Sequence, residues 1–99
     1  MIIYNVTISI ESDIEQEWLK WIKETHIPDV LDTGLFKSSN MYKIIPLEIE
    51  ENTYCIQYSC DSIKEYNLYQ EKYAKEIQEK HTSRYKEKFI AFRTLLETI

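Results

Sequence analysis

The chain has 99 residues, of which 43% are hydrophobic and 29% are charged, and its formal net charge is −5. This length and composition predict one globular domain that needs no metal or disulfide to fold. The acidic balance disfavours nucleic acid and anionic membranes as partners, because affinity for both depends on Lys and Arg. The longest apolar run is too short to span a bilayer.

The first half of the chain predicts a strand, a helix and a second strand. Apolar and polar residues alternate over residues 1–10, which is typical of a strand with one buried face. A helix follows from Ser12 or Asp13, with Ile14, Trp18, Trp21, Ile22 and Thr25 at helical spacing. Pro28 disfavours helical geometry at Ile27, so we expect a kink or break near His26 and a short helix that ends at Gly34. Residues 36–45 form the second predicted strand.

The second half of the chain predicts a turn followed by a strand, a helix and a final strand. Residues 47–52 are acidic and predict a turn, and residues 53–60 alternate as a third strand. Ser62 and Glu65 have capping-box spacing and begin a long helix that runs to about Tyr85. Its predicted buried stripe is Ile63, Tyr66, Tyr73, Ala74, Ile77 and His81. Residues 89–99 form the fourth predicted strand.

The order βαββαβ predicts an α+β ferredoxin-like fold, a four-stranded antiparallel sheet with two helices on one face. The apolar faces of the first and third strands should lie under the helices. The polar residues Asn5, Thr7, Ser9, Cys55, Gln57 and Ser59 then lie on the helix-free face. Alternation alone leaves the side of Arg93 open.

Four stretches along the chain carry a resemblance. They are Met1-Ile2-Ile3-Tyr4-Asn5-Val6-Thr7, the segment from Glu17-Trp18-Leu19-Lys20-Trp21 to His26-Ile27-Pro28-Asp29-Val30-Leu31, Thr53-Tyr54-Cys55-Ile56-Gln57-Tyr58, and Phe89-Ile90-Ala91-Phe92-Arg93-Thr94. Together they resemble a family of short bacterial proteins known as a domain of unknown function. More distantly, the chain resembles the dimeric α/β-barrel proteins, which pair two ferredoxin-like sheets face to face. That resemblance implies the fold and a homodimer, but no particular chemistry.

Two charged or titratable residues are candidates for a site. His26, at the predicted helix break, suits a general base or a ligand-anchoring group. The simpler interpretation, which we favour, is a helix-terminal histidine that hydrogen-bonds the last carbonyls. Arg93 lies inside a strand, where it suits a bidentate anchor for a carboxylate or phosphate. The simpler interpretation is an ion pair, for example with Glu97 or with an acid of a second subunit.

Three further residues are candidates for a binding site because of where they lie in the predicted fold. Asn5 and Gln57 belong to the polar sheet face, which a dimer would convert into the lining of a barrel. Trp21 is one of several aromatic residues that line either a ligand pocket or an ordinary core, and we favour the core. The others are Trp18, Tyr4, Tyr54, Tyr58, Tyr66 and Tyr73.

Metal and cofactor motifs are not evident. Cys55 and Cys60 point to opposite faces of one predicted strand, so they should not bridge, and with no signal peptide we expect reduced thiols in a cytoplasmic protein. With His26 and His81 they have no spacing typical of zinc ligands. One glycine leaves no phosphate-binding loop. We therefore expect neither a metal nor a cofactor.

Three functions remain as hypotheses. The leading one is a homodimeric module that binds a small molecule or a partner without catalysis. The alternative is a cofactor-free enzyme, similar to a monooxygenase or isomerase, with His26 as base and Arg93 as anion anchor. A weaker one is a regulatory subunit that docks on a larger partner through its free sheet face or edge.

Overall fold

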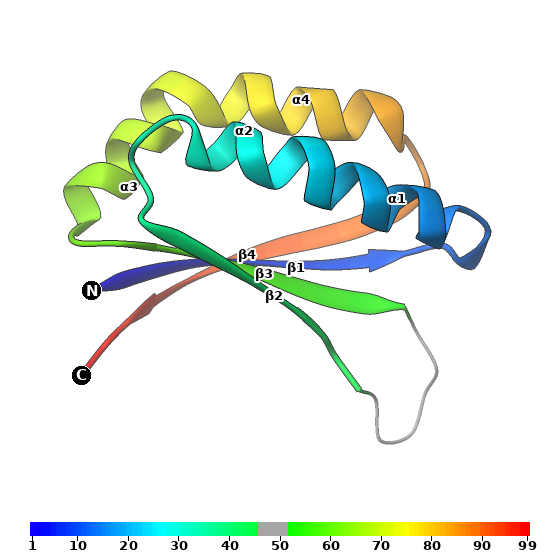
Figure 1. The fold of residues 1–99 in the computed structure, drawn as a ribbon, viewed down its shortest axis with the longest axis horizontal. Coiled ribbons are helices and arrows are strands. Elements are labelled where there is room, and N and C mark those ends of the chain that lie inside the picture. Colours follow the sequence, from blue (N-terminus) through cyan, green and yellow to red (C-terminus); the bar gives the residue numbers. More distant parts are fainter. Residues whose placement is uncertain (46–51) are drawn as a thin grey trace.

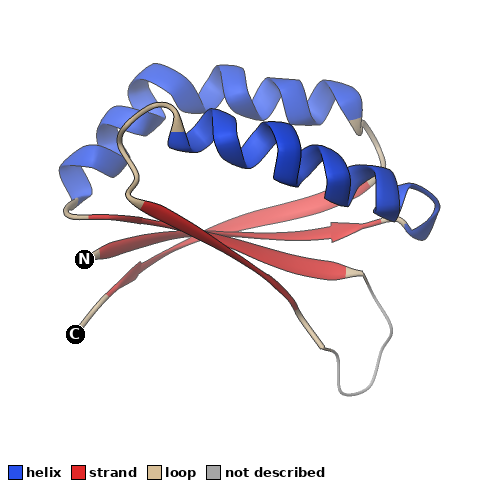
Figure 2. Cartoon of the chain, viewed as in Figure 1, coloured by secondary structure: helices blue, strands red, loops and turns tan. Residues whose placement is uncertain are grey.

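The computed structural model describes residues 1–45 and 52–99 and shows two long helical segments on one face of an antiparallel sheet (Figure 1). The strands are β1 (Ile2–Ile10), β2 (Ser38–Lys43), β3 (Thr53–Cys60) and β4 (Phe89–Glu97), in the order β2-β3-β1-β4. Figure 2 shows the two layers, with both helical segments above the sheet. The predicted βαββαβ fold is confirmed.

The first helical segment runs without a break from residue 12 to residue 31. It consists of the short 3₁₀ turn η1 (Ser12–Ile14), α1 (Glu15–Trp21), the π-helical turn η2 (Ile22–His26) and α2 (Ile27–Leu31). Of the kink or break predicted near His26, the break does not occur, because both His26 and Ile27 keep helical backbone angles. Pro28 removes one backbone donor, and the wider π turn accommodates that loss within the helix. Gly34 follows with a positive φ of 79°, which a glycine adopts without strain.

The second helical segment also contains a π turn. It consists of α3 (Ile63–Tyr69), η3 (Gln70–Ala74) and α4 (Lys75–Arg84), close to the predicted range. Ser62 caps it, accepting from the Lys64 amide and donating to Glu65. The predicted buried stripe is partly wrong. Ile63, the first residue of α3, is exposed. Tyr73 is also exposed, whereas Tyr69 and Ala74 are buried, because η3 adds a residue and makes the step between these two buried positions five. Tyr85 is buried as well.

Sheet register fixes which side chains lie under the helices. β1 pairs with β4 through Tyr4–Leu95, Val6–Arg93 and Ile8–Ala91. It pairs with β3 through Tyr4–Tyr58, Val6–Ile56 and Ile8–Tyr54. The β1 and β3 members of this set are buried in the core. Because paired residues point to the same face, Arg93 lies on the helix side, which settles the position that alternation left open.

The helix-free face carries the other half of each strand. Asn5 pairs with Gln57, and Thr7 pairs with Cys55 and Phe92. These polar residues are joined on β4 by apolar side chains that are largely exposed, Ile90 at 75% and Phe92 at 60%. The predicted polar face is thus confirmed at its centre but is apolar along its β4 edge.

Two strands, β2 and β4, are shorter than expected. β2 spans Ser38–Lys43 rather than residues 36–45, because Phe36 instead packs in the core, and β4 ends at Glu97. Of the acidic turn predicted over residues 47–52, all but Asn52 lies outside the described residues. Within the described ranges, none of the helices is long and apolar enough to cross a membrane.

Candidate functional site

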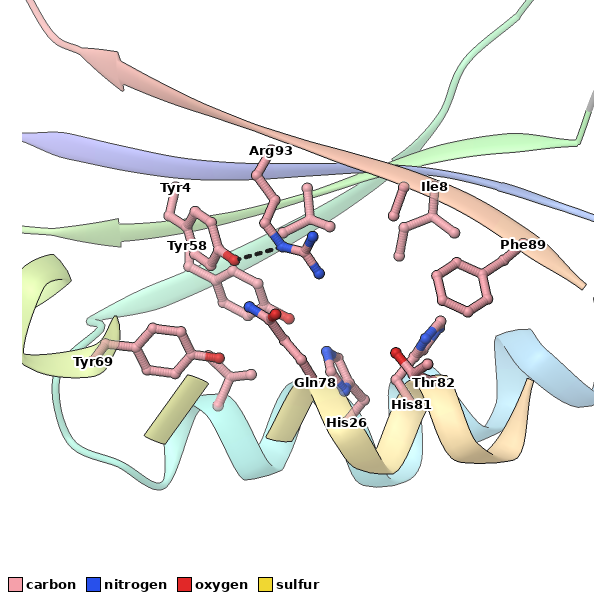
Figure 3. A pocket seen from close by; sticks show the side chains of 13 residues that line it. Tyr4, Ile8, His26, Tyr58, Tyr69, Gln78, His81, Thr82, Phe89 and Arg93 are labelled. Atoms are coloured by element: carbon pink, nitrogen blue, oxygen red, sulfur yellow. Dashed lines mark hydrogen bonds between the residues drawn. The ribbon is translucent and has the colours of Figure 1, made fainter. Parts of the chain in front are cut away.

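A small cavity lies between the sheet and the helices, near the β4 side of the domain. Its volume is about 30 Å³, enough for roughly two water-sized groups. Three strands (β1, β3 and β4) and both helical segments contribute side chains, which are Tyr4, Val6, Ile8, His26, Val30, Tyr58, Tyr69, Gln78, His81, Thr82, Phe89, Ala91 and Arg93. Figure 3 shows Arg93 reaching from β4 toward the helices, and His26 and Gln78 reaching back from the helices toward it.

Arg93 brings a positive charge to this cavity. Its Nε donates a hydrogen bond to the hydroxyl of Tyr4 at 3.1 Å (Figure 3). The ion pair with Glu97 that the simpler interpretation predicted does not form. None of the ion pairs among the described residues includes Arg93. The guanidinium therefore keeps donors available for another group.

His26 faces the same cavity from the end of η2. Burial and then the Arg93 guanidinium lower the pKa of His26 to about 4. This direction is opposite to that expected for a histidine stabilised in its charged form by a helix C-terminus. His26 is therefore a neutral group beside a cation at physiological pH.

His81 of α4 is the second imidazole at the cavity, with its ring centroid 5.7 Å from that of His26. Its Nε2 accepts a hydrogen bond from Trp18 Nε1 at 2.9 Å. Burial, His26 and Arg93 together lower the pKa of His81 to about 4. The bond from Trp18 requires Nε2 to be unprotonated, so neutral His81 carries its proton on Nδ1.

Three tyrosines form the inner part of the cavity. Tyr4, Tyr58 and Tyr69 are each no more than 2% exposed. Tyr4 accepts from Arg93, but the buried hydroxyl of Tyr58 has no hydrogen-bond partner among the described residues. Burial, then Tyr69 and Tyr4, raise the pKa of Tyr58, so this hydroxyl stays protonated and can donate. A buried hydroxyl with no partner costs stability, which makes Tyr58 the most unusual feature of the cavity.

The remaining predicted site residues lie elsewhere. Asn5 and Gln57 are half-buried neighbours on the helix-free face, and Asn5 donates to Thr7 at 3.1 Å. Trp21 packs behind the cavity, with its ring 5.6 Å from that of His26 and the Arg84 guanidinium 5.6 Å from its centroid. The structure thus brings His26 and Arg93 together and separates both from Asn5 and Gln57 by the sheet.

The four residues considered as metal ligands do not form one group. His26 and His81 are adjacent, but Cys60 is buried near Ser62, and Cys55 lies on the other face of the sheet. Within the described part of the chain, no three His, Cys, Asp or Glu side chains converge as metal ligands.

Sequence reasoning missed several cavity residues. Tyr58 and Tyr4 were candidates for either a ligand pocket or the core, with the core favoured, and Gln78 and Thr82 were not considered. A signal for Tyr58 was present, because a tyrosine at a buried position of a central strand needs a partner for its hydroxyl. Gln78 gave no such signal, because a glutamine on a helix is usually solvated.

The strand order, the two covering helices and the antiparallel register define a ferredoxin-like domain. The chain belongs over residues 1–99 to the family described as a domain of unknown function, DUF4286. No curated protein sequence matches the chain.

Solved structures share the fold at low sequence identity. A dimeric ferredoxin-like protein from an uncultured marine organism has a TM-score of 0.74 and 16% identity, with 100% of this chain and 95% of that chain covered. An ethyl tert-butyl ether D (EthD) family protein from Bacillus halodurans has a TM-score of 0.69 and 11% identity, with both chains fully covered at 100%. A cofactor-independent oxygenase from Streptomyces nogalater has a TM-score of 0.69 and 8% identity, with 98% of this chain and 92% of that chain covered.

Proposed function

We propose that this protein binds a small organic molecule in the cavity between its helices and its sheet. The observation that carries the proposal is the hydroxyl of Tyr58, which is buried, has no hydrogen-bond partner among the described residues and lines the cavity. A core built only for stability would satisfy or avoid such a group. A ligand that accepts a hydrogen bond from Tyr58 supplies the missing partner.

The other polar groups of the cavity support a binding role. Arg93 and His26 converge there from β4 and η2, and the aromatic walls of Tyr69 and Phe89 supply apolar contact. A few convergent polar groups in a mostly apolar setting are typical of small-molecule sites. Arg93 is exposed while Tyr58 is 1% exposed, so the cavity extends from the surface to the core.

We further propose that the protein works as a homodimer that buries the helix-free face. The exposed apolar side chains of that face lie on β4 and β2; they are Tyr42, Ile90, Phe92 and Leu96. Ile90, Phe92 and Leu96 form a row along the outer strand β4, whereas Tyr42 lies on the opposite outer strand β2. An exposed apolar row of this kind marks an interaction site. Two structures of the same fold, both from uncultured marine organisms, are described as dimeric ferredoxin-like proteins, which favours a second copy as the partner.

The binding proposal is tested by NMR on protein labelled with ¹³C in its histidine rings. A diverse set of neutral and charged fragments is added at millimolar concentration, and the imidazole signals of His26 and His81 are followed. We expect a subset of fragments to shift both signals saturably, and Tyr58→Phe to weaken the fragments that accept a hydrogen bond. Tyr42→Phe, which removes a hydroxyl from the helix-free face, is the matched control. If no fragment shifts either imidazole, the proposal is wrong.

A second function, proton transfer without a cofactor, is favoured by the state of His26. Its imidazole is neutral at physiological pH and lines the same cavity as Arg93. An anionic molecule held at Arg93 would offset the charge that lowers the His26 pKa and so make His26 a stronger base toward an acidic C–H or O–H group of that molecule. Binding alone does not require His26 to titrate. A substrate whose turnover fails in His26→Gln, while its affinity is kept, would establish the enzyme; unchanged turnover would exclude His26 as the base.

A further inference from the structure

The side chains that line the cavity carry positive charge and no negative charge. Arg93 and two neutral imidazoles line it, and none of the lining residues is Asp or Glu. This is unusual in a chain with 17 acidic residues and a net charge of −5. The chain's other arginine, Arg84, makes a 3.0 Å ion pair with Glu17, whereas Arg93 has only the Tyr4 hydroxyl as a hydrogen-bond partner among the described residues.

Two groups of the cavity, the Arg93 guanidinium and the Tyr58 hydroxyl, carry donors that find no acceptor among the described residues. A guanidinium offers five N–H donors and no acceptor, and Tyr4 takes only the Nε–H of Arg93. The protonated Tyr58 hydroxyl adds one more donor, for which the described part of the chain offers no acceptor. The group that complements this set is an acceptor with negative charge. A carboxylate fits it best, because its two oxygens match the planar fork of a guanidinium.

The size of the cavity favours a carboxylate over a phosphate. A volume of about 30 Å³ holds a group of roughly two water-sized atoms. Arg93 is the single cationic side chain in the lining, and a phosphate monoester dianion would keep an unbalanced charge there. The rest of the ligand extends toward solvent, where Thr82 and Arg93 are exposed.

From these observations we propose that the cavity recognises the carboxylate of a small monocarboxylic acid through Arg93 and the hydroxyl of Tyr58. This inference rests on the proposed binding function and names the class of its ligand. A consequence is that binding takes up a proton at lower pH, because a bound carboxylate offsets the Arg93 charge that disfavours protonated His26.

Butyrate and butyramide are suitable probes, because they have the same shape and differ in charge. The His26 and His81 imidazole signals are titrated with each probe at low ionic strength, in the wild-type protein, Arg93→Gln, Tyr58→Phe and the control Arg84→Gln. We expect butyrate to bind at least about tenfold more tightly than butyramide, since a charge-assisted hydrogen bond is lost in the amide. Arg93→Gln should abolish this preference, Tyr58→Phe should weaken butyrate about threefold, and Arg84→Gln should change neither.

The outcomes separate the two proposals. If butyramide, or any neutral fragment, binds as tightly as butyrate, the cavity binds ligands but the carboxylate inference is wrong. If inorganic phosphate binds more tightly than butyrate, the inference is also wrong. If no probe of any kind shifts the imidazoles, both proposals fail. Because the comparison of the two probes uses the wild-type protein, it decides the question even where a variant does not fold.

Butyrate provides a further readout that a purely structural arginine would not give. We expect bound butyrate to raise the pKa of His26 from about 4, and butyramide to leave it unchanged. The same rise should be absent in Arg93→Gln. A His26 pKa that butyrate does not move would contradict the placement of the carboxylate beside Arg93.

Discussion

Two neutral imidazoles and a positively charged guanidinium share one cavity. Burial first, and then the positive charge of the Arg93 guanidinium, lower the pKa of His26 and of His81 and hold both imidazoles neutral. Trp18 holds His81 in one tautomer by donating to its Nε2 at 2.9 Å. The neutral histidines allow the cavity to keep a cation without further repulsion. Protonating them therefore has a cost that stability measurements can detect.

We predict that the protein loses stability as the pH falls from 7 to 5. The pKa of each histidine is about 4 when folded and about 6.5 when unfolded, so the unfolded chain binds more protons between these values and gains stability as the pH falls. The free energy of unfolding should drop by about 2 kcal/mol per histidine, or somewhat less for the coupled pair. Urea denaturation at several pH values measures this drop.

The variant His26→Gln is the control for this prediction. Its side chain stays polar but does not titrate, so the pH-dependent loss should fall to about half. Equal stability at pH 7 and pH 5 in the wild-type protein would show that neither imidazole is held neutral by the fold.

How far single residues were predictable depended on their partners. The position of Arg93 was open from the sequence, because either face of an edge strand accepts a charge, and only the pairing of Arg93 with Val6 decided it. His26 was singled out for the wrong reason, the expected helix break, yet it does face the cavity. Asn5 and Gln57 were correctly placed on one face, but nothing in a strand pattern says that Arg93 and His26 meet behind it.

At the scale of elements, the strands were predictable and the helices only in outline. Alternation with period two identifies strand faces residue by residue, and register then follows from burial. The helical stripe was misread at Tyr73 because a period of 3.6 was assumed through η3. A π turn leaves no reliable mark in a single sequence. Both turns lie in the helical segments that cover the sheet, and η2 ends at His26.

The π turn η3 leads to a prediction about deletions. Deleting Lys72 within η3 shortens the buried step from Tyr69 to Ala74 from five to four, which a regular α-helix keeps on one face. We expect this deletion to cost no more than about 1 kcal/mol of unfolding free energy, because the core stays in phase.

Deleting Lys80 in α4 is the matched control, since it removes the same type of exposed residue. There the helix is already regular, so His81 and Tyr85 rotate by about 100° away from the core. The expected cost is about 3 kcal/mol or more, as for other losses of buried side chains. Equal costs for the two deletions in urea denaturation would contradict the role assigned to η3.

At the scale of the whole molecule, the two faces of the sheet have different tasks. The helix-covered face holds the core and the cavity, and the other face is open, with apolar side chains along β4. The order of strands and helices along the chain predicted these two faces, but a single sequence does not reveal what covers the open face. The proposed dimer assigns it to a second copy.

The dimer is tested by Ile90→Lys. Ile90 is 75% exposed on the helix-free face, so the substitution leaves the monomer fold intact but buries a charge in the proposed interface, which is costly. We expect sedimentation velocity at micromolar concentration to give a dimer for the wild-type protein and a monomer for the variant. Ile63→Lys, at a position that is 44% exposed at the start of α3, should remain dimeric. A monomeric wild-type protein would refute the proposal.

Fragment soaking of crystals tests the binding site itself most directly. Small carboxylates and their amides are soaked at millimolar concentration, and the position of any bound molecule is read from electron density. We expect a carboxylate between the Arg93 guanidinium and the Tyr58 hydroxyl, within hydrogen-bonding distance of both. Fragments that bind only elsewhere, for example on the helix-free face beside Asn5 and Gln57, would contradict it.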